Sequence, residues 1–197
     1  ATAKYILKIM KGLPDTVTTK CPEQVDTNDK FFEHLEGEVT KLLTAAYHDK
    51  DVLASIKKKS SAKAKKDGVD PLDYWLSHAE NSIKKEWQDE DGDTHDLYQF
   101  SRKYQFTDKD TGEIKSLRPT FWAPKPVEEG KEQEFEQIDV DYIASGTVVI
   151  FQYQLRLFQM GKSYGVAGDL GPNIVVVYKK KKKNKAPKLS VPLFDEE

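Results

Sequence analysis

The sequence predicts a protein of the α+β class that is mainly β, with about three helices inserted in its N-terminal half. Between residues 28 and 47, apolar residues recur at intervals of three and four, which is the period of an α-helix. Beyond the acidic turn at 89–93, apolar and polar residues alternate instead, which is the period of a β-strand. The chain of 197 residues is also long enough to bury a substantial core. We therefore expect one domain over residues 1–178, including a helical insertion at 27–88, followed by a tail at 179–197.

Composition excludes several classes of protein. The formal net charge is -2, so the overall charge does not by itself point to a nucleic-acid partner. Evidence for such a partner must come from where the charged residues lie. Cys21 is the only cysteine, which excludes an internal disulfide framework and a cysteine-cluster zinc site and fits a reducing compartment. No apolar stretch approaches the roughly 20 residues that span a bilayer, so we expect no membrane association and a cytoplasmic location.

The first half of the chain opens with a strand and a long helix. Residues 4–10 are a β-prone run, which predicts the first strand. Thr27 or Asn28 is available as the N-cap of an amphipathic helix over residues 28–47. The apolar stripe of this helix is expected to contain Phe31, Leu35, Val39, Leu42, Leu43 and Ala46.

Two shorter helices are expected next. A helix over residues 52–56 is predicted to dissolve into the tract 57–68, which is rich in lysine, has little to bury and is expected to form a mobile loop. Asp70 and Pro71 supply a capping carboxylate and a residue preset for the first helical turn, so a third helix is expected to begin there. At intervals of four, its inward stripe would contain Trp75, Ala79, Ile83 and Trp87.

The second half is expected to begin with a hairpin. One strand face would carry Tyr98, Phe100, Arg102, Tyr104 and Phe106. Residues 107–113 would form the turn, and residues 114–122 would return as the partner strand. Three of the aromatic residues alternate as a core face should: Tyr98, Phe100 and Phe106. Arg102 breaks that face, so it lies near an exposed strand end, is turned outward by a bulge, or pairs internally.

The longest predicted strand covers residues 147–159. Its apolar side would contain Val149, Phe151, Tyr153, Leu155 and Leu157, and its other side Gln152, Gln154, Arg156 and Phe158. A loop over 161–172 would lead to a last strand at 174–178. Helices inserted among roughly five strands predict an OB-like barrel, a partly open five-stranded architecture that commonly binds oligonucleotides.

Aromatic and cationic side chains are interleaved on two of these segments. Bases of a single strand stack on aromatic or apolar side chains, while lysine and arginine follow the phosphates. The candidate binding residues on the long strand and its loop are Arg156, Phe158, Met160, Lys162 and Tyr164. The candidates from the hairpin are Arg102, Lys103, Tyr104, Lys115, Arg118 and Trp122. The alternative for Phe158 and Tyr164 is that they cap one end of the barrel core.

The sequence gives little support to an enzymatic function. Residues 161–163 resemble the end of a phosphate-binding loop, but that motif needs a glycine where Arg156 stands and a helix after it. The acidic turn at 89–93 lacks the glycine and glutamate positions of a calcium loop, and the scattered carboxylates form no clear metal pair for a nuclease. We expect no catalytic residues, no metal and no cofactor.

From about Tyr98 to Lys180 the sequence resembles the OB-fold single-stranded DNA-binding proteins of short-tailed bacteriophages. The resemblance is carried by residues 106–109 after an aromatic strand, by Gly146 before the long strand, and by Tyr153-x-Leu155-x-x-Phe158 followed by Gly165-Val166. It implies a protein that coats single-stranded DNA during phage replication, recombination or repair, in the cytoplasm of the infected bacterium. By resemblance, Phe158 and Met160 would contact bases and Lys103 a phosphate. Met160 departs from the family's aromatic residue, and Tyr164 offers a replacement.

The same family has an acidic C-terminal tail ending in an aromatic residue. The resemblance implies that such a tail serves dimer exchange and recruits the phage polymerase or helicase-primase, so a homodimer is a further expectation. Here the lysine run 179–183 is followed at the end by Phe194 and three carboxylates. Either the tail has diverged or the chain is truncated. The alternative function is an OB-like interaction module that binds RNA or a replication protein through its helical insertion.

Overall fold

β-strands outnumber helical segments in the computed structural model, which describes residues 4–11, 23–88, 91–126, 132–140, 143 and 147–178. The main sheet contains eight strands: β1 (Lys4–Met10), β2 (Glu80–Asn81), β3 (Lys84–Gln88), β4 (Thr94–Lys103), β7 (Thr120–Pro124), β8 (Phe135–Ile138), β9 (Val148–Met160) and β10 (Ser163–Tyr178). A separate hairpin contains β5 (Gln105–Thr107) and β6 (Ile114–Ser116). The helices are α2 (Glu23–His48), α3 (Ala54–Asp67) and α4 (Pro71–His78).

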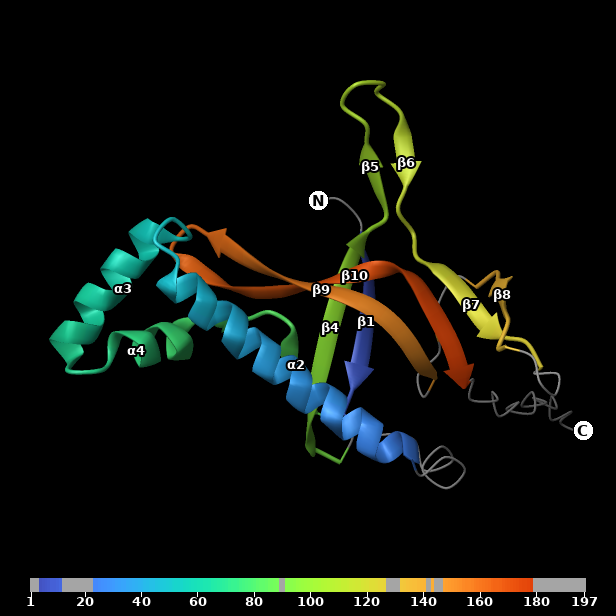
Figure 1. Cartoon of the computed structure of the whole chain (residues 1–197), viewed down its shortest axis with the longest axis horizontal. Helices are drawn as coiled ribbons and strands as arrows, with labels where there is room; N and C mark the ends of the chain where they lie inside the picture. Colours follow the sequence, from blue (N-terminus) through green and yellow to red (C-terminus); the bar gives the residue numbers. More distant parts are fainter. Residues whose placement is uncertain are drawn as a thin grey trace, which may run out of the picture.

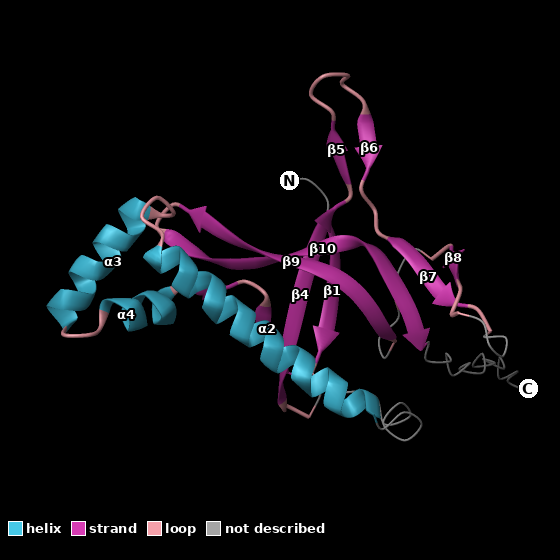
Figure 2. Cartoon of the chain, in the orientation of Figure 1, coloured by secondary structure: helices cyan, strands magenta, loops and turns pink. Residues whose placement is uncertain are grey.

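The main sheet is organised around β10. The path through it is β1-β4-β10-β7-β8, and β2, β3 and β9 pair alongside. β9 and β10 form a long antiparallel hairpin, while β10 also pairs in parallel with β2, β4 and β7 in succession. The sheet curls, with α2 lying across it and the β5–β6 hairpin projecting from the body (Figure 1). This mainly β, partly open fold, with three helices in the described part of the N-terminal half, confirms the predicted α+β, OB-like class (Figure 2).

The core lies between α2 and the inner face of the curled sheet. Phe32, Leu35 and Val39 of α2 are buried against Phe100 of β4 and Val166 of β10. The predicted apolar side of the long strand also packs here: Val149, Phe151, Tyr153, Leu155 and Leu157. The first strand, the long helix and the long strand are therefore confirmed. Thr27 and Asn28 are not N-caps, because α2 begins at Glu23 and both residues therefore lie within the helix.

The lysine-rich tract is helical, so the prediction of a mobile loop over 57–68 is wrong. α3 runs to Asp67 and ends at Gly68, whose φ of 70° is left-handed. Ile56, Ser60 and Ala64 recur at intervals of four on its buried side, and the two small residues let α3 lie close to α4. Lys57 is also buried, and its ammonium group donates to the carbonyl oxygens of Ala46 (3.0 Å) and Asp49 at the end of α2.

The third helix begins as predicted but ends at His78, before the last residues of the apolar stripe predicted for it. The Asp70 carboxylate accepts from the backbone N–H groups of Leu72 and Asp73, as an N-cap does. Trp75 is buried, whereas Trp87 is 44% exposed on β3, since α4 ends at His78 and the chain turns into β2 and β3. The prediction that both tryptophans pack inward is thus wrong for Trp87, and the helical part of the insertion ends ten residues before 88.

The predicted hairpin is divided in two. β4 ends at Lys103, and only residues 105–107 pair with 114–116, in the separate β5–β6 hairpin. Residues 120–124 form β7, which pairs with β8 and β10 instead of with β4. Phe106 is 40% exposed on the projecting hairpin, so its prediction as a core residue is wrong.

The predicted loop over 161–172 is mostly strand. The turn between β9 and β10 is only two residues, Gly161 and Lys162, and β10 then continues for 16 residues with an irregularity between Leu170 and Ile174. The sequence misleads here because β10 contains glycines that usually mark loops. A Cβ atom at Gly168 would lie 2.5 Å from Cδ1 of Phe100, so this glycine permits close strand packing.

Candidate nucleic-acid interface

The face of the sheet that points away from α2 is open over β1, β4, β9 and β10. Strand register builds this face, because residues directly opposite each other on paired strands share a side. One continuous row is Ile6, Ser101, Asp169 and Gln154, one residue from each of these strands. The next residues on the same face include Lys4 opposite Lys103, and Arg156 opposite Ala167.

Five of these residues line a hollow of about 370 Å³. Lys4, Lys103 and Arg156 bring three cations to its lining, together with Ser101 and Asp169. The Asp169 carboxylate is occupied by Arg156, whose Nε lies 2.8 Å from Oδ2. Lys4 and Lys103 form no ion pair with any residue in the described part of the chain, so two ammonium groups here remain available for an anion.

Three predicted site residues continue along β9 to the turn of the hairpin. Phe158 is half-buried opposite Gly165 and belongs to neither of the two clusters of buried side chains. Met160 is 74% exposed, and Lys162 is exposed in the turn. The strand thus presents an aromatic ring, a flexible apolar side chain and a cation in succession, which suits stacked bases and a phosphate.

The cations of the β5–β6 region lie over aromatic rings. Lys115 is 6.0 Å from the ring centroid of Phe106, and it also pairs with Asp108 at 2.6 Å. The Arg118 guanidinium lies 5.1 Å from the ring centroid of Tyr104. These residues form a second group, separate from the hollow.

Trp122 lies on β7, opposite Val175 of β10. Its indole Nε1–H donates to Oδ1 of Asn173 at 3.1 Å, and its ring is partly exposed. The structure therefore does not place the predicted site residues in one cluster: they are distributed over the hollow, the distal part of β9, the β5–β6 region and β7.

Two predicted site residues make their contacts inside the protein instead. Tyr164 is only 5% exposed, stacks on Trp75 with centroids 4.0 Å apart, and donates its hydroxyl to the Trp75 carbonyl at 2.7 Å. Of its two predicted roles, the structure supports the capping of a core. Arg102 donates from Nε to the carbonyl of Leu117 at 2.5 Å and from Nη1 to that of Leu170 at 3.2 Å. It therefore pairs internally, which is the third of its three alternatives.

Lys4 is the cation of the hollow that sequence reasoning missed. The alternation within β1 contained the signal, since Tyr5 and Leu7 are buried while Lys4, Ile6 and Lys8 are exposed. The sequence did not reveal which strand pairs with β1. Only the pairing with β4 puts Lys4 beside Lys103.

Other kinds of site find no support in the described part of the chain. No group of three or more histidine, cysteine, aspartate or glutamate side chains among the described residues could hold a metal ion. None of the described helices is long and apolar enough to cross a membrane.

Comparison with known proteins finds similarity to solved structures but none to a protein family or a curated protein. Among solved structures, it is similar to the crystal structure of gp2.5, a single-stranded DNA-binding protein encoded by bacteriophage T7. The two chains are 16% identical, the alignment covers 93% of this chain and 78% of that chain, and the TM-score is 0.41.

Proposed function

We propose that this protein binds single-stranded DNA without sequence preference, through the open face of the sheet. Lys4 and Lys103 neutralise phosphates at the hollow, Arg156 offsets the charge of Asp169 beside them, and Phe158 and Met160 stack against bases along β9. The observation that carries this proposal is the juxtaposition of Lys4 and Lys103, two exposed lysines on paired strands with no ion-pair partner among the described residues.

The energetics of the lysine pair favour an anionic ligand. Like charges directly opposite each other on neighbouring strands repel, which destabilises the sheet. Asp169 could have compensated this charge, but Arg156 already occupies its carboxylate at 2.8 Å. A phosphate bound between Lys4 and Lys103 would offset their repulsion and release the counterions condensed on the DNA.

The surroundings of the hollow suit a single strand better than a small molecule. The hollow is lined by polar and charged side chains, whereas pockets for small ligands are lined mostly by apolar ones. It also continues into the row of β9 that ends at Met160 and Lys162. A row of this kind can follow a flexible backbone, because stacking tolerates any base.

The wider biological role extends this proposal. A non-enzymatic protein that coats single strands would act in phage DNA replication, recombination or repair, as the sequence resemblance implies. Recruitment of polymerase or helicase-primase through the tail stays a prediction, since residues 179–197 lie outside the described residues. The homodimer stays a prediction as well.

The decisive experiment measures binding to oligo-dT by fluorescence anisotropy over a range of salt concentrations. The variant K4Q/K103Q removes the two cations of the hollow. The matched control, K41Q/K125Q, removes two exposed lysines that are ion-paired with Glu38 and Glu134. Thermal unfolding of both variants shows whether either change disturbs the fold.

Neutralising the hollow should weaken binding and flatten its salt dependence. Each lost phosphate contact lowers the slope of log K against log salt by about 0.7 for single strands, so K4Q/K103Q should lower it by about 1.4. The control should retain the slope of the unaltered protein. Absent or salt-insensitive binding by the unaltered protein would refute the proposal, and equal losses in the two variants would refute the assignment of the hollow. Oligo-rU in parallel tests the preference for DNA, which depends on contacts at the 2′ position.

A further inference from the structure

The basic surface of α3 has no role in the interface described above. Its 14 residues contain six lysines and one acid. Lys57 is buried and caps the end of α2, but the other five are exposed: Lys58, Lys59, Lys63, Lys65 and Lys66. None of these five forms an ion pair with a residue that the structure describes. Like charges one turn apart destabilise a helix, so α3 concentrates uncompensated positive charge on a firmly packed element.

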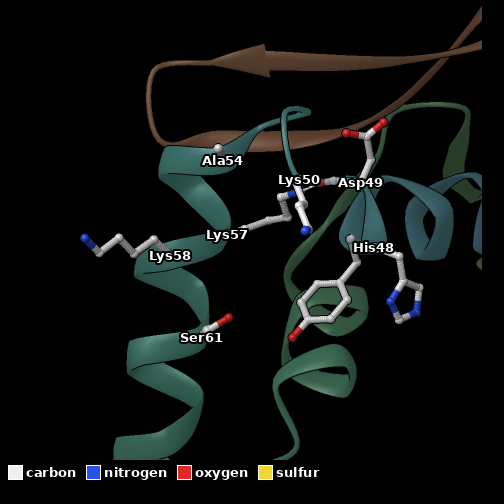
Figure 3. A pocket seen from close by; sticks show the side chains of 8 residues that line it. His48, Asp49, Lys50, Ala54, Lys57, Lys58 and Ser61 are labelled. Atoms are coloured by element: carbon white, nitrogen blue, oxygen red, sulfur yellow. Dashed lines mark hydrogen bonds between the residues drawn. The ribbon is translucent and has the colours of Figure 1, made fainter.

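A hollow of about 380 Å³ adjoins one side of this helix (Figure 3). Its lining includes a tyrosine ring, a histidine ring, two exposed ammonium groups and a hydroxyl, from Tyr47, His48, Lys50, Lys58 and Ser61, and also the buried Lys57. In Figure 3 these side chains come from the end of α2, the following turn and the first turns of α3. Aromatic rings beside cations are the side chains that hold the bases and phosphates of a single strand.

One carboxylate lies in the same lining, and its hydrogen bonds are already made. Oδ1 of Asp49 accepts from the backbone N–H groups of Asp51 at 2.9 Å and Val52 at 3.2 Å. These bonds lower the pKa of Asp49, so it is ionised, and it shapes the turn that presents Lys50. Lys50 and Lys58 together outweigh its charge.

The lysines of α3 divide between two sides of the helix. Ala54, Lys58 and Ser61 line the hollow, and Lys65 follows Ser61 by four residues, so it continues the same side. The remaining exposed lysines recur at intervals of four and three on the adjacent side: Lys59, Lys63 and Lys66. The lysines of α3 therefore fall into two sets, one on the side of the hollow and one on the adjacent side.

The hollow lies close to the end of the β9 row. Ile56 of α3 is buried in one cluster with Trp75 and Tyr164, and Leu157 of β9 packs against that cluster. Figure 3 shows the β9–β10 ribbon passing beside the first turn of α3 at Ala54. A strand that follows β9 to Met160 and Lys162 thus arrives beside α3.

We infer that α3 and its adjoining hollow form a second contact region for single-stranded DNA. A strand long enough to extend past the tip of the β9–β10 hairpin places a base against Tyr47 or His48 and its phosphates beside Lys50, Lys58 and Lys65. This inference rests on the proposed function, because it extends the same path from the sheet to the helices.

The test compares two triple variants and two oligonucleotide lengths. K50Q/K58Q/K65Q removes the cations on the side of the hollow, and K59Q/K63Q/K66Q removes three cations from the adjacent side of α3. Lysine and glutamine have similar helix propensities, so the two variants differ in position and not in charge change. Oligo-dT of about 6 nucleotides fits within the site size of a single OB fold, whereas about 30 nucleotides exceeds it.

The hollow-side variant should behave differently from its control only on the long strand. On about 30 nucleotides, K50Q/K58Q/K65Q should lower the salt slope by about 2, three contacts at about 0.7 each, while K59Q/K63Q/K66Q stays near the unaltered protein. On about 6 nucleotides, all three proteins should bind alike. Equal losses in both variants, no loss in either, or a loss that also appears on the short strand would overturn the inference. Those results leave the proposed function intact, whereas failure of the unaltered protein to bind either length overturns both.

Discussion

Tyr164 and Phe158 are matched aromatic residues on paired strands with opposite expected roles. Both were candidates for base stacking, yet Tyr164 is 5% exposed and Phe158 lies outside both buried clusters. Replacing each in turn separates stability from binding. We expect Tyr164→Phe to lower stability without changing DNA affinity, and Phe158→Ala to lower affinity with a smaller effect on stability.

The magnitude for Tyr164 follows from the hydrogen bond that its hydroxyl donates to Trp75. Burial raises the pKa of its phenol, so the hydroxyl stays protonated and donates to the Trp75 carbonyl at 2.7 Å. Tyr164→Phe keeps the ring stacked on Trp75 but leaves that buried carbonyl without its donor, which costs about 1–3 kcal/mol. In a chain of this size, each kcal/mol lowers Tm by about 2–4 °C.

The magnitude for Phe158 comes from lost stacking. Truncating a stacking aromatic residue costs about 1–3 kcal/mol per base, which corresponds to about 5- to 150-fold in Kd. Thermal unfolding and oligo-dT anisotropy on the same preparations give both quantities. If Tyr164→Phe weakened binding while Tm stayed constant, the assignment of Tyr164 to the core would be refuted. If Phe158→Ala bound normally, β9 would not be a stacking row.

Two further predictions concern the fold that holds the interface. Gly168→Ala should destabilise by about 1–3 kcal/mol in chemical denaturation, because the new methyl group would lie 2.5 Å from the Phe100 ring. The control Gly37→Ala, in α2 with no atom within 4 Å, should instead stabilise by about 0.5–1 kcal/mol, and equal effects would contradict the packing argument. The hydrogen bond from Tyr98 holds the pKa of Glu36 below its ordinary value. The ionised carboxylate therefore stabilises the fold at pH values above the pKa that Glu36 has in the unfolded chain. This stabilisation is lost as the pH falls through the lower pKa of the folded state. Tm of the unaltered protein and Glu36→Gln should therefore differ at pH 7 and converge below about pH 4; a constant difference would count against this linkage.

The sequence predicts those elements whose pattern is local and strong. The alternation from Val149 to Leu157 required only that one side of a strand face the core, and that side packs as expected. The apolar positions of α2 and the N-cap of α4 at Asp70 are equally local, and both are found in the structure. In each case the residues that decide the element lie within the element itself.

Where the prediction failed, residues distant in sequence decide the structure. The lysine-rich tract becomes a helix because Ser60 and Ala64 fit against α4 and because Lys57 caps α2, and no window of the tract contains those partners. Trp87 follows the helical period of Trp75, yet pairing of β3 with β4 places it on a strand opposite His95. The helical period of the sequence continues beyond the end of α4 at His78, where the pairing of β3 with β4 decides the structure instead.

The candidate site shows the same division. Lys103 and Arg156 could be identified individually, because each is a cation on a predicted strand. Their proximity could not be, since it depends on β10 reaching β4 in the register that sets Asp169 opposite Ser101. That register also brings Arg156, which is bound to Asp169, to the edge of the hollow that Lys4 completes.

Glycines of β10 make this register possible. A Cβ atom at Gly165 would overlap the backbone of Glu80 in β2, and one at Gly168 would meet Phe100 in β4. Side chains at either position would push β10 away from its parallel neighbours. The glycines that resemble loop residues in the sequence are therefore what allows the strands to approach, and the hollow forms where that approach brings cations from β1, β4 and β9 together. It follows that Gly168→Ala should weaken DNA binding as well as stability, even though Gly168 itself offers the DNA no side chain.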